Sequence, residues 1–115
     1  MANPLSLLFT NRTSRQLVLA DQRILGAVWS TPLPEVLPLG TTGGPYGSVG
    51  ADSGYSGSLS YQPEGAESLV GLSFEISNDG RILLTPSGSP PFEVLEKAFQ
   101  DGDLWIVRLV FLRRG

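Results

Sequence analysis

Residues 26–61, GAVWSTPLPEVLPLGTTGGPYGSVGADSGYSGSLSY, contain the features that decide the fold. The stretch begins with an apolar segment ending at Trp29, and it closes with Tyr55–Tyr61, where apolar and serine side chains alternate as in a β-strand. Three prolines between residues 32 and 38 interrupt regular pairing, because proline donates no N–H to a ladder. Gly40–Gly54 is too rich in glycine for a central strand, so we predict a long loop or an irregular edge there.

Short runs of alternating apolar and polar residues continue on both sides of this stretch, and turn residues separate them. This pattern is typical of antiparallel β-strands. The strands that we expect are Leu5–Thr10, Gln16–Asp21, Ile24–Ser30, Tyr55–Tyr61, Leu69–Ser77, Arg81–Thr85, Phe92–Gln100 and Leu104–Leu112, with Val36–Leu37 as a brief edge strand. The chain of 115 residues is therefore predicted to be all-β, with a single domain over residues 1–115 that folds as an antiparallel β-sandwich of about eight short strands.

The two C-terminal segments need more argument. The spacing of apolar residues in Phe92–Gln100 also fits a helix, but the Asp101-Gly102 pair that follows is typical of a hairpin turn, and we predict a strand. Leu104–Leu112 is apolar on both faces apart from Arg108. A strand of this kind is expected in the middle of a sheet, covered on both sides.

Composition and charge limit the classes of function. Hydrophobic residues make up 41% of the chain, which suits a globular fold rather than a disordered one. The formal net charge of −3 disfavours a nucleic-acid binder. The first residues lack the features of a signal peptide, and no apolar run is long enough for a membrane-spanning helix. We therefore expect a soluble protein, and the sequence leaves its location open.

No catalytic centre is evident in the sequence. The chain has neither histidine nor cysteine, which excludes Ser-His-Asp and thiol catalysis. Carboxylate pairs such as Glu93 with Glu96 are explained by turns and strand edges more simply than by glycosidase chemistry. Gly43–Gly50 lacks the lysine of a phosphate-binding loop, and no EF-hand pattern is present. We predict a protein that is not an enzyme and has no cofactor and no metal site.

Aromatic and basic side chains remain as candidates for a binding surface. Loops of more than about 12–15 residues are uncommon unless they are functional or flexible, so the glycine-rich loop, which holds Tyr46, is the first candidate. Trp29 and Tyr55 flank this loop, and their rings suit a membrane interface or stacking on sugars. Packing in the core is the alternative for both rings. Arg12 and Arg15 offer charge-assisted hydrogen bonds to lipid phosphates.

A skeleton of turn residues resembles a known family. It comprises Asn11-Arg12-Thr13 before Leu17-Val18-Leu19, then Gly26, Trp29, Pro32, Pro34 and Pro38, then Ser48-Val49 and Gly57-Ser58-Leu59-Ser60-Tyr61. Over residues 5–76 this skeleton is similar to the aegerolysins and the related small bacterial crystal-type lytic proteins. The resemblance implies an antiparallel sandwich that binds membrane lipids, typically sphingolipids. It also implies hemolysin-like, pore-forming activity on target membranes after release, often with a larger pore-forming partner.

Three hypotheses follow, because a shared fold does not fix the function. The first is a membrane-lipid-binding domain whose contact residues are Trp29, Tyr46, Tyr55, Arg12 and Arg15. The second is a lectin-like domain that binds glycans, in which the tyrosines stack on sugars and Asp52 or Asp79 accepts bonds from hydroxyl groups. The third is a structural subunit whose low surface charge reflects contacts in a homo-oligomer.

Overall fold

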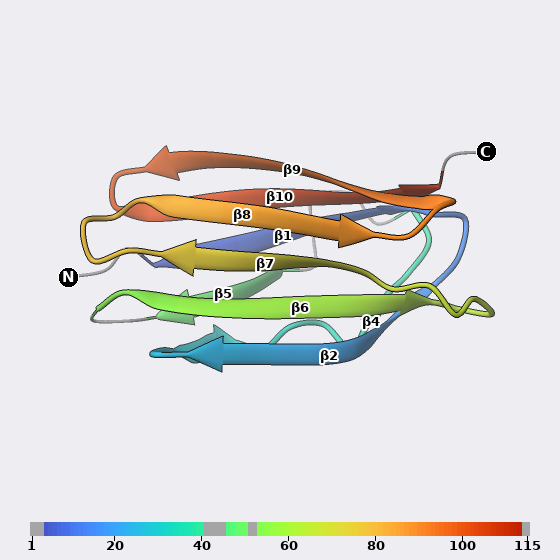
Figure 1. The fold of residues 1–115 in the computed structure, drawn as a ribbon, viewed down its shortest axis with the longest axis horizontal. Helices are drawn as coiled ribbons and strands as arrows, with labels where there is room; N and C mark the ends of the chain where they lie inside the picture. The colour runs from blue at the N-terminus through green and yellow to red at the C-terminus, as the bar shows by residue number, and fades with distance from the viewer. Residues whose placement is uncertain (1–3, 41–45, 51–52, 114–115) are drawn as a thin grey trace.

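The computed structural model describes residues 4–40, 46–50 and 53–113, and these residues form ten β-strands in two five-stranded sheets (Figure 1). Sheet A contains, in spatial order, β3 (Val28–Thr31), β5 (Tyr46–Gly50), β1 (Leu5–Arg12), β10 (Leu104–Arg113) and β9 (Phe92–Asp101). Sheet B contains β4 (Val36–Leu37), β2 (Leu17–Leu25), β6 (Tyr55–Pro63), β7 (Val70–Ile76) and β8 (Ile82–Gly88). The predicted all-β sandwich is confirmed.

The core lies between the two sheets and is formed by alternate residues of each strand. Phe9 on β1 and Phe111 on β10 stack with their ring centroids 6.1 Å apart, and Tyr61 from the opposite sheet approaches the two rings at 5.8 and 5.9 Å. These separations lie in the range in which aromatic pairs attract each other. The Tyr61 hydroxyl donates a hydrogen bond of 2.6 Å to the Pro34 carbonyl, and burial raises the pKa of this hydroxyl. The three rings therefore join the sheets at the centre of the sandwich.

Pairing is antiparallel throughout the described sheets except between β1 and β10, which run parallel from Leu5 opposite Trp105 to Arg12 opposite Leu112. The first and last strands are thus neighbours in the middle of sheet A. Such a parallel pair needs a long connection, which here is the rest of the chain. No helix of the described part is long and apolar enough to cross a membrane.

The glycine-rich stretch differs from the prediction. Tyr46–Gly50 is a strand, β5, that lies between β3 and β1 rather than in a loop or at an edge. Gly47 makes a close contact, because a Cβ atom there would lie 2.9 Å from a terminal methyl of Leu33, which would have to shift. The glycine that argued against a strand is therefore what lets Leu33 pack over it. Residues 41–45 and 51–52 lie outside the described part.

The expected third strand, Ile24–Ser30, is divided between the two sheets. A β-bulge between Leu19 and Asp21 lets β2 continue to Leu25 instead of ending at Asp21. The chain then turns at Gly26, whose φ of 84° favours glycine, and β3 joins sheet A. This turn is how the chain crosses from one layer of the sandwich to the other.

The two C-terminal segments form a hairpin, as predicted. Phe92–Asp101 is a strand, β9, and it pairs antiparallel with β10 along its whole length. The central position of β10 is confirmed, but the expected cover on both sides is wrong for the part of the chain that the structure describes. The outward-facing apolar residues of β10 are only half-buried, and no described strand lies over them.

Candidate functional site

The predicted aromatic residues lie at one end of the sandwich and are packed to different degrees. Tyr55 on β6 is 4% exposed, and burial raises the pKa of its hydroxyl. Trp29 on β3 is half-buried. Both rings meet Phe74 edge-on, at centroid distances of 6.4 Å for Tyr55 and 6.2 Å for Trp29. Core packing, the alternative reading for both residues, therefore describes Tyr55 fully and Trp29 in part.

The predicted basic residues lie at the opposite end. Strand β1 starts beside Val49, the partner of Trp29, and ends at Arg12 beside Leu112, so its length separates Arg12 from Trp29 (Figure 1). Arg12 is exposed, whereas Nη1 of Arg15 donates a hydrogen bond of 2.8 Å to the Glu64 carbonyl. The predicted contact residues that the structure describes do not converge on one site.

Two further predicted residues fall wholly or partly outside the description. The backbone of Tyr46 lies in β5 opposite Leu8, but its side chain is outside the described part. Asp52, offered for a lectin-like site, is also outside it.

The Asn11-Arg12-Thr13 motif of the resemblance has a structural role in this chain. The Asn11 side chain is 1% exposed, and its Nδ2 donates hydrogen bonds to the carbonyls of Arg15 and Leu37, both at 2.9 Å. Its Oδ1 accepts hydrogen bonds from the backbone N–H of Thr13 at 3.1 Å and from the Thr13 hydroxyl at 2.7 Å. The Asn11 side chain thus holds the turn between β1 and β2 against β4 through hydrogen bonds. In the folded domain, Nδ2 of the Asn11-Arg12-Thr13 sequon is therefore buried and bonded rather than exposed.

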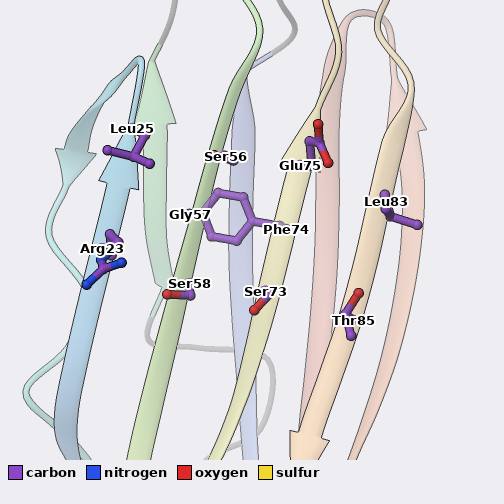
Figure 2. Close-up of a pocket in the computed structure, with 10 residues that line it drawn as sticks. All are labelled: Arg23, Leu25, Ser56, Gly57, Ser58, Ser73, Phe74, Glu75, Leu83 and Thr85. Carbon is purple, nitrogen blue, oxygen red and sulfur yellow. The ribbon is translucent and has the colours of Figure 1, made fainter.

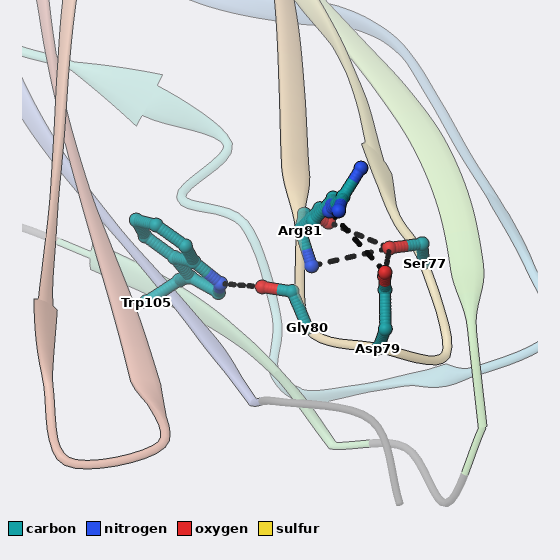
Figure 3. Close-up of polar contacts among 5 residues, drawn as sticks. All are labelled: Ser77, Asp79, Gly80, Arg81 and Trp105. Carbon is teal, nitrogen blue, oxygen red and sulfur yellow. Dashed lines mark hydrogen bonds and ion pairs between the residues drawn. The ribbon is translucent and has the colours of Figure 1, made fainter.

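The turn between β7 and β8 holds a second polar cluster (Figure 3). Asp79 accepts a hydrogen bond from the Ser77 hydroxyl and forms an ion pair of 3.2 Å with Arg81. The Ser77 bond, followed by the charge of Arg81, lowers the pKa of Asp79, so its contribution to stability is present at neutral pH and is lost as the pH falls through that lowered value. Nε1 of Trp105 donates a hydrogen bond of 2.8 Å to the Gly80 carbonyl. These contacts stabilise the turn and tie it to sheet A.

Replacing Trp105 with phenylalanine should lower the free energy of unfolding by about 1 kcal/mol, because the Gly80 carbonyl loses its donor while most of the ring packing is kept. Urea denaturation followed by circular dichroism measures the change. Trp29→Phe is the matched control, since the Trp29 indole has no hydrogen bond among the described residues, and it should cost less. Equal losses in the two variants would contradict a role for the Trp105 hydrogen bond.

The outer face of sheet A is the first of two surfaces that the predicted residues do not include. Strand pairing aligns three rows there, Ser6–Ile106–Phe99, Leu8–Arg108–Lys97 and Thr10–Val110–Leu95. At one end the row is Arg12–Leu112–Glu93, and at the other Asp101 lies opposite Leu104, so one carboxylate lies at each end of this face. Phe99 and Leu95 are 42% and 44% exposed. We call these residues, from Ser6 to Val110 with Arg12, the cationic apolar face. The signal for it was present in the sequence, because the hairpin turn at Asp101-Gly102 by itself places Lys97 opposite Arg108.

The outer face of sheet B is the second surface, and it is polar and hollowed (Figure 2). Strand pairing aligns two rows across four strands, Arg23–Ser58–Ser73–Thr85 and Leu25–Ser56–Glu75–Leu83. These rows line a shallow groove of about 310 Å³, which we call the serine groove. Alternation within β6 predicted that its serines share one face, but the partners of that face depend on pairing between distant strands.

The described residues offer no group of three or more histidine, cysteine, aspartate or glutamate side chains that could hold a metal ion. A scan against models of known protein families found no match to this chain, and a search of curated proteins also found no match.

Proposed function

We propose that this protein is a non-enzymatic membrane-binding domain and that it contacts an anionic lipid surface with the cationic apolar face. One observation carries the proposal. Lys97 and Arg108 lie directly opposite each other on paired strands, with Arg12 on the same face, among exposed apolar side chains. The resemblance to aegerolysins favours lipid binding independently of this face.

The repulsion between Lys97 and Arg108 destabilises the protein when no ligand is bound. Like charges directly opposite on a sheet are destabilising, by a few tenths to about 1 kcal/mol. Among the described residues, Lys97, Arg108 and Arg12 form no ion pair with a carboxylate, and Glu93 and Asp101 lie at the ends of the face rather than beside the opposed pair. A negatively charged partner would remove this repulsion. The pair therefore supports an anionic binding partner.

The apolar side chains around these cations support a lipid surface as that partner. Phe99, Leu95 and Ile106 surround the two charges and would reach the boundary between headgroups and acyl chains while the cations meet phosphates. Each basic residue near an anionic membrane surface contributes about 1 kcal/mol. The chain as a whole has a net charge of −3. An anionic membrane would therefore repel the rest of the protein surface, so that the cationic apolar face is the one turned toward the membrane.

Vesicle sedimentation tests the proposal with three compositions: phosphatidylcholine alone, phosphatidylcholine with phosphatidylserine, and sphingomyelin. Wild-type protein should sediment best with the phosphatidylserine vesicles. Arg108→Glu should weaken that binding by about 2 kcal/mol, or roughly thirtyfold, because an attraction becomes a repulsion of similar size. Raising the salt concentration should weaken wild-type binding as well.

Arg23→Glu is the matched control, because Arg23 is also an exposed arginine within a strand and the change in net charge is identical, but it lies on sheet B. It should bind nearly as well as wild type. Equal losses in both variants would attribute binding to net charge alone. A wild-type protein that ignores all three compositions would refute the proposal. A larger pore-forming partner stays a prediction from the resemblance.

Self-association is the second candidate, favoured by the exposure of Phe99 and Leu95 on one face. Two copies stacked through this face would bring Lys97 and Arg108 of each close to those of the other, which opposes a dimer. Sedimentation velocity distinguishes the two functions. A stable dimer that Phe99→Ala dissociates would replace membrane binding with assembly.

A further inference from the structure

We infer that the serine groove is a second binding site, on the opposite sheet from the cationic apolar face, and that its ligand is a neutral carbohydrate. The inference is independent of membrane binding, since it uses none of the same residues. It rests on the shape of the groove, on hydroxyl groups that lack partners and on a pair of opposite charges that are held apart.

The groove has the dimensions of a short oligosaccharide site. Neighbouring strands in a sheet are about 4.8 Å apart, so the four strands β2, β6, β7 and β8 give a floor about 14 Å wide. Its volume of about 310 Å³ lies at the lower end of the range for small-ligand sites. Figure 2 shows Ser58 and Ser73 between Arg23 on one side and Thr85 on the other. The small serine side chains on β6 and β7, between Arg23 and Leu25 on β2 and Leu83 on β8, make the hollow.

The floor offers hydroxyl groups with no other use. The side-chain hydroxyls of Ser56, Ser58, Ser73 and Thr85 form no hydrogen bond with any other described residue. Each hydroxyl can donate one hydrogen bond and accept others, which matches the hydroxyl groups of a sugar. Leu25 and Leu83, both 61% exposed, form the two rims and give apolar surface to the C–H faces of a sugar ring.

The charges of the groove favour a neutral ligand. Arg23 lies on β2 and Glu75 on β7, and β6 runs between them, so their backbones are about 10 Å apart and the two groups form no ion pair. Each is therefore available to bond sugar hydroxyls. An anionic ligand that met Arg23 would also face Glu75, and a cationic ligand would meet the reverse conflict. On the cationic apolar face the opposed pair Lys97–Arg108 lies at the centre and the carboxylates Glu93 and Asp101 lie at the two ends, so the centre of that face is positive.

The floor is closely packed at its centre. Gly57 lies between Ser56 and Ser58, and a Cβ atom there would lie 2.6 Å from the Arg23 carbonyl oxygen and 2.6 Å from the Phe74 ring. Strand β6 is thus held tightly between β2 and the core. This packing fixes the backbone that carries the serines before a ligand arrives, which reduces the entropy lost on binding.

A panel of neutral and acidic oligosaccharides, free in solution, tests the inference by NMR titration of ¹⁵N-labelled protein. At least one neutral oligosaccharide should shift the amide resonances of Ser58, Ser73 and their row neighbours. Ser58→Val should weaken that binding at least tenfold, because one hydroxyl is lost and a methyl group intrudes on the floor. The matched control is Ser6→Val, a half-buried strand serine on the outer face of sheet A, and it should bind as wild type does.

Several results would overturn the inference. One is that no oligosaccharide shifts any amide resonance, and another is that the shifts are confined to residues of sheet A. The third is that Ser58→Val and wild-type protein bind equally well. The same oligosaccharides carried on glycolipid vesicles identify the source, since a carbohydrate site binds both forms and a lipid site binds only the vesicles. Failure here is separable from failure of membrane binding, because Arg108→Glu leaves the groove intact and Ser58→Val leaves the cationic apolar face intact.

Discussion

Replacing Phe9 with alanine is expected to lower the free energy of unfolding by about 3–5 kcal/mol, the usual cost of removing a buried aromatic ring. Phe9 is fully buried, and it contacts both other rings of the central cluster, Tyr61 and Phe111. Those neighbours come from rigid paired strands of the two sheets, so they cannot move in to fill the cavity. Since small domains are stable by only about 5–15 kcal/mol, the variant should be close to unfolding at physiological temperature.

Chemical denaturation monitored by tryptophan fluorescence measures this loss, and Phe99→Ala is the matched control. Phe99 is the same residue type in a strand of the same sheet, but it faces outward and is 42% exposed. Its removal should change stability by less than about 1 kcal/mol, while weakening sedimentation with phosphatidylserine vesicles. The reverse pattern, with Phe9→Ala mild and Phe99→Ala severe, would mean that the faces of sheet A are assigned wrongly.

Replacing Asn11 with alanine should cost about 3 kcal/mol of stability, far more than a typical surface asparagine. The substitution leaves the Leu37 carbonyl without its donor and removes the acceptor of both the Thr13 N–H and the Thr13 hydroxyl. Buried polar groups without partners cost about 1–3 kcal/mol each. Urea denaturation measures the loss. Asn78→Ala is the control, because Asn78 lies exposed in a turn and accepts one hydrogen bond, from the Gly54 N–H.

The near-isosteric Asn11→Asp variant separates hydrogen bonding from packing. Its carboxylate would face the Leu37 and Pro38 carbonyls in the positions that the amide nitrogen occupies, so burial and repulsion should raise its pKa. A raised pKa in the folded state means that folding binds a proton. Stability should therefore increase as the pH is lowered from about 7 to about 5, opposite to the trend expected from ordinary carboxylates. A loss without this pH dependence would indicate that Asn11 acts through its volume alone.

Much of the fold could be predicted because the information is local. Alternation in Leu69–Ser77 and the Asn78-Asp79-Gly80 turn after it specify a hairpin without reference to the rest of the chain, and the structure pairs β7 with β8 there. The strand β5 could not be predicted in this way. Its glycine at position 47 indicates a loop until Leu33, from a different part of the chain, is seen to pack against it.

The site was harder to predict because residue type does not determine burial. Tyr55 and Trp29 are chemically suited to a membrane interface, but both meet Phe74, and only the pairing of β6 with β7 and of β3 with β5 reveals that. The serine groove depends on four strands that span residues 17–88, so no local pattern contains it. The opposed Lys97 and Arg108 were accessible from one hairpin, and a search for like charges across predicted turns would have found them.

The parallel pairing of β1 with β10 also determines how the domain responds to mechanical load. Leu5 begins one strand at one end of the sandwich, and Arg113 finishes its neighbour at the other end. Tension applied between these two residues slides the strands past each other, so the evenly spaced hydrogen bonds of the pair share the load and must break together. A hairpin pulled at its open end would instead separate one bond at a time. The domain should therefore resist tension between residues 5 and 113 more strongly than tension that opens the β9–β10 hairpin.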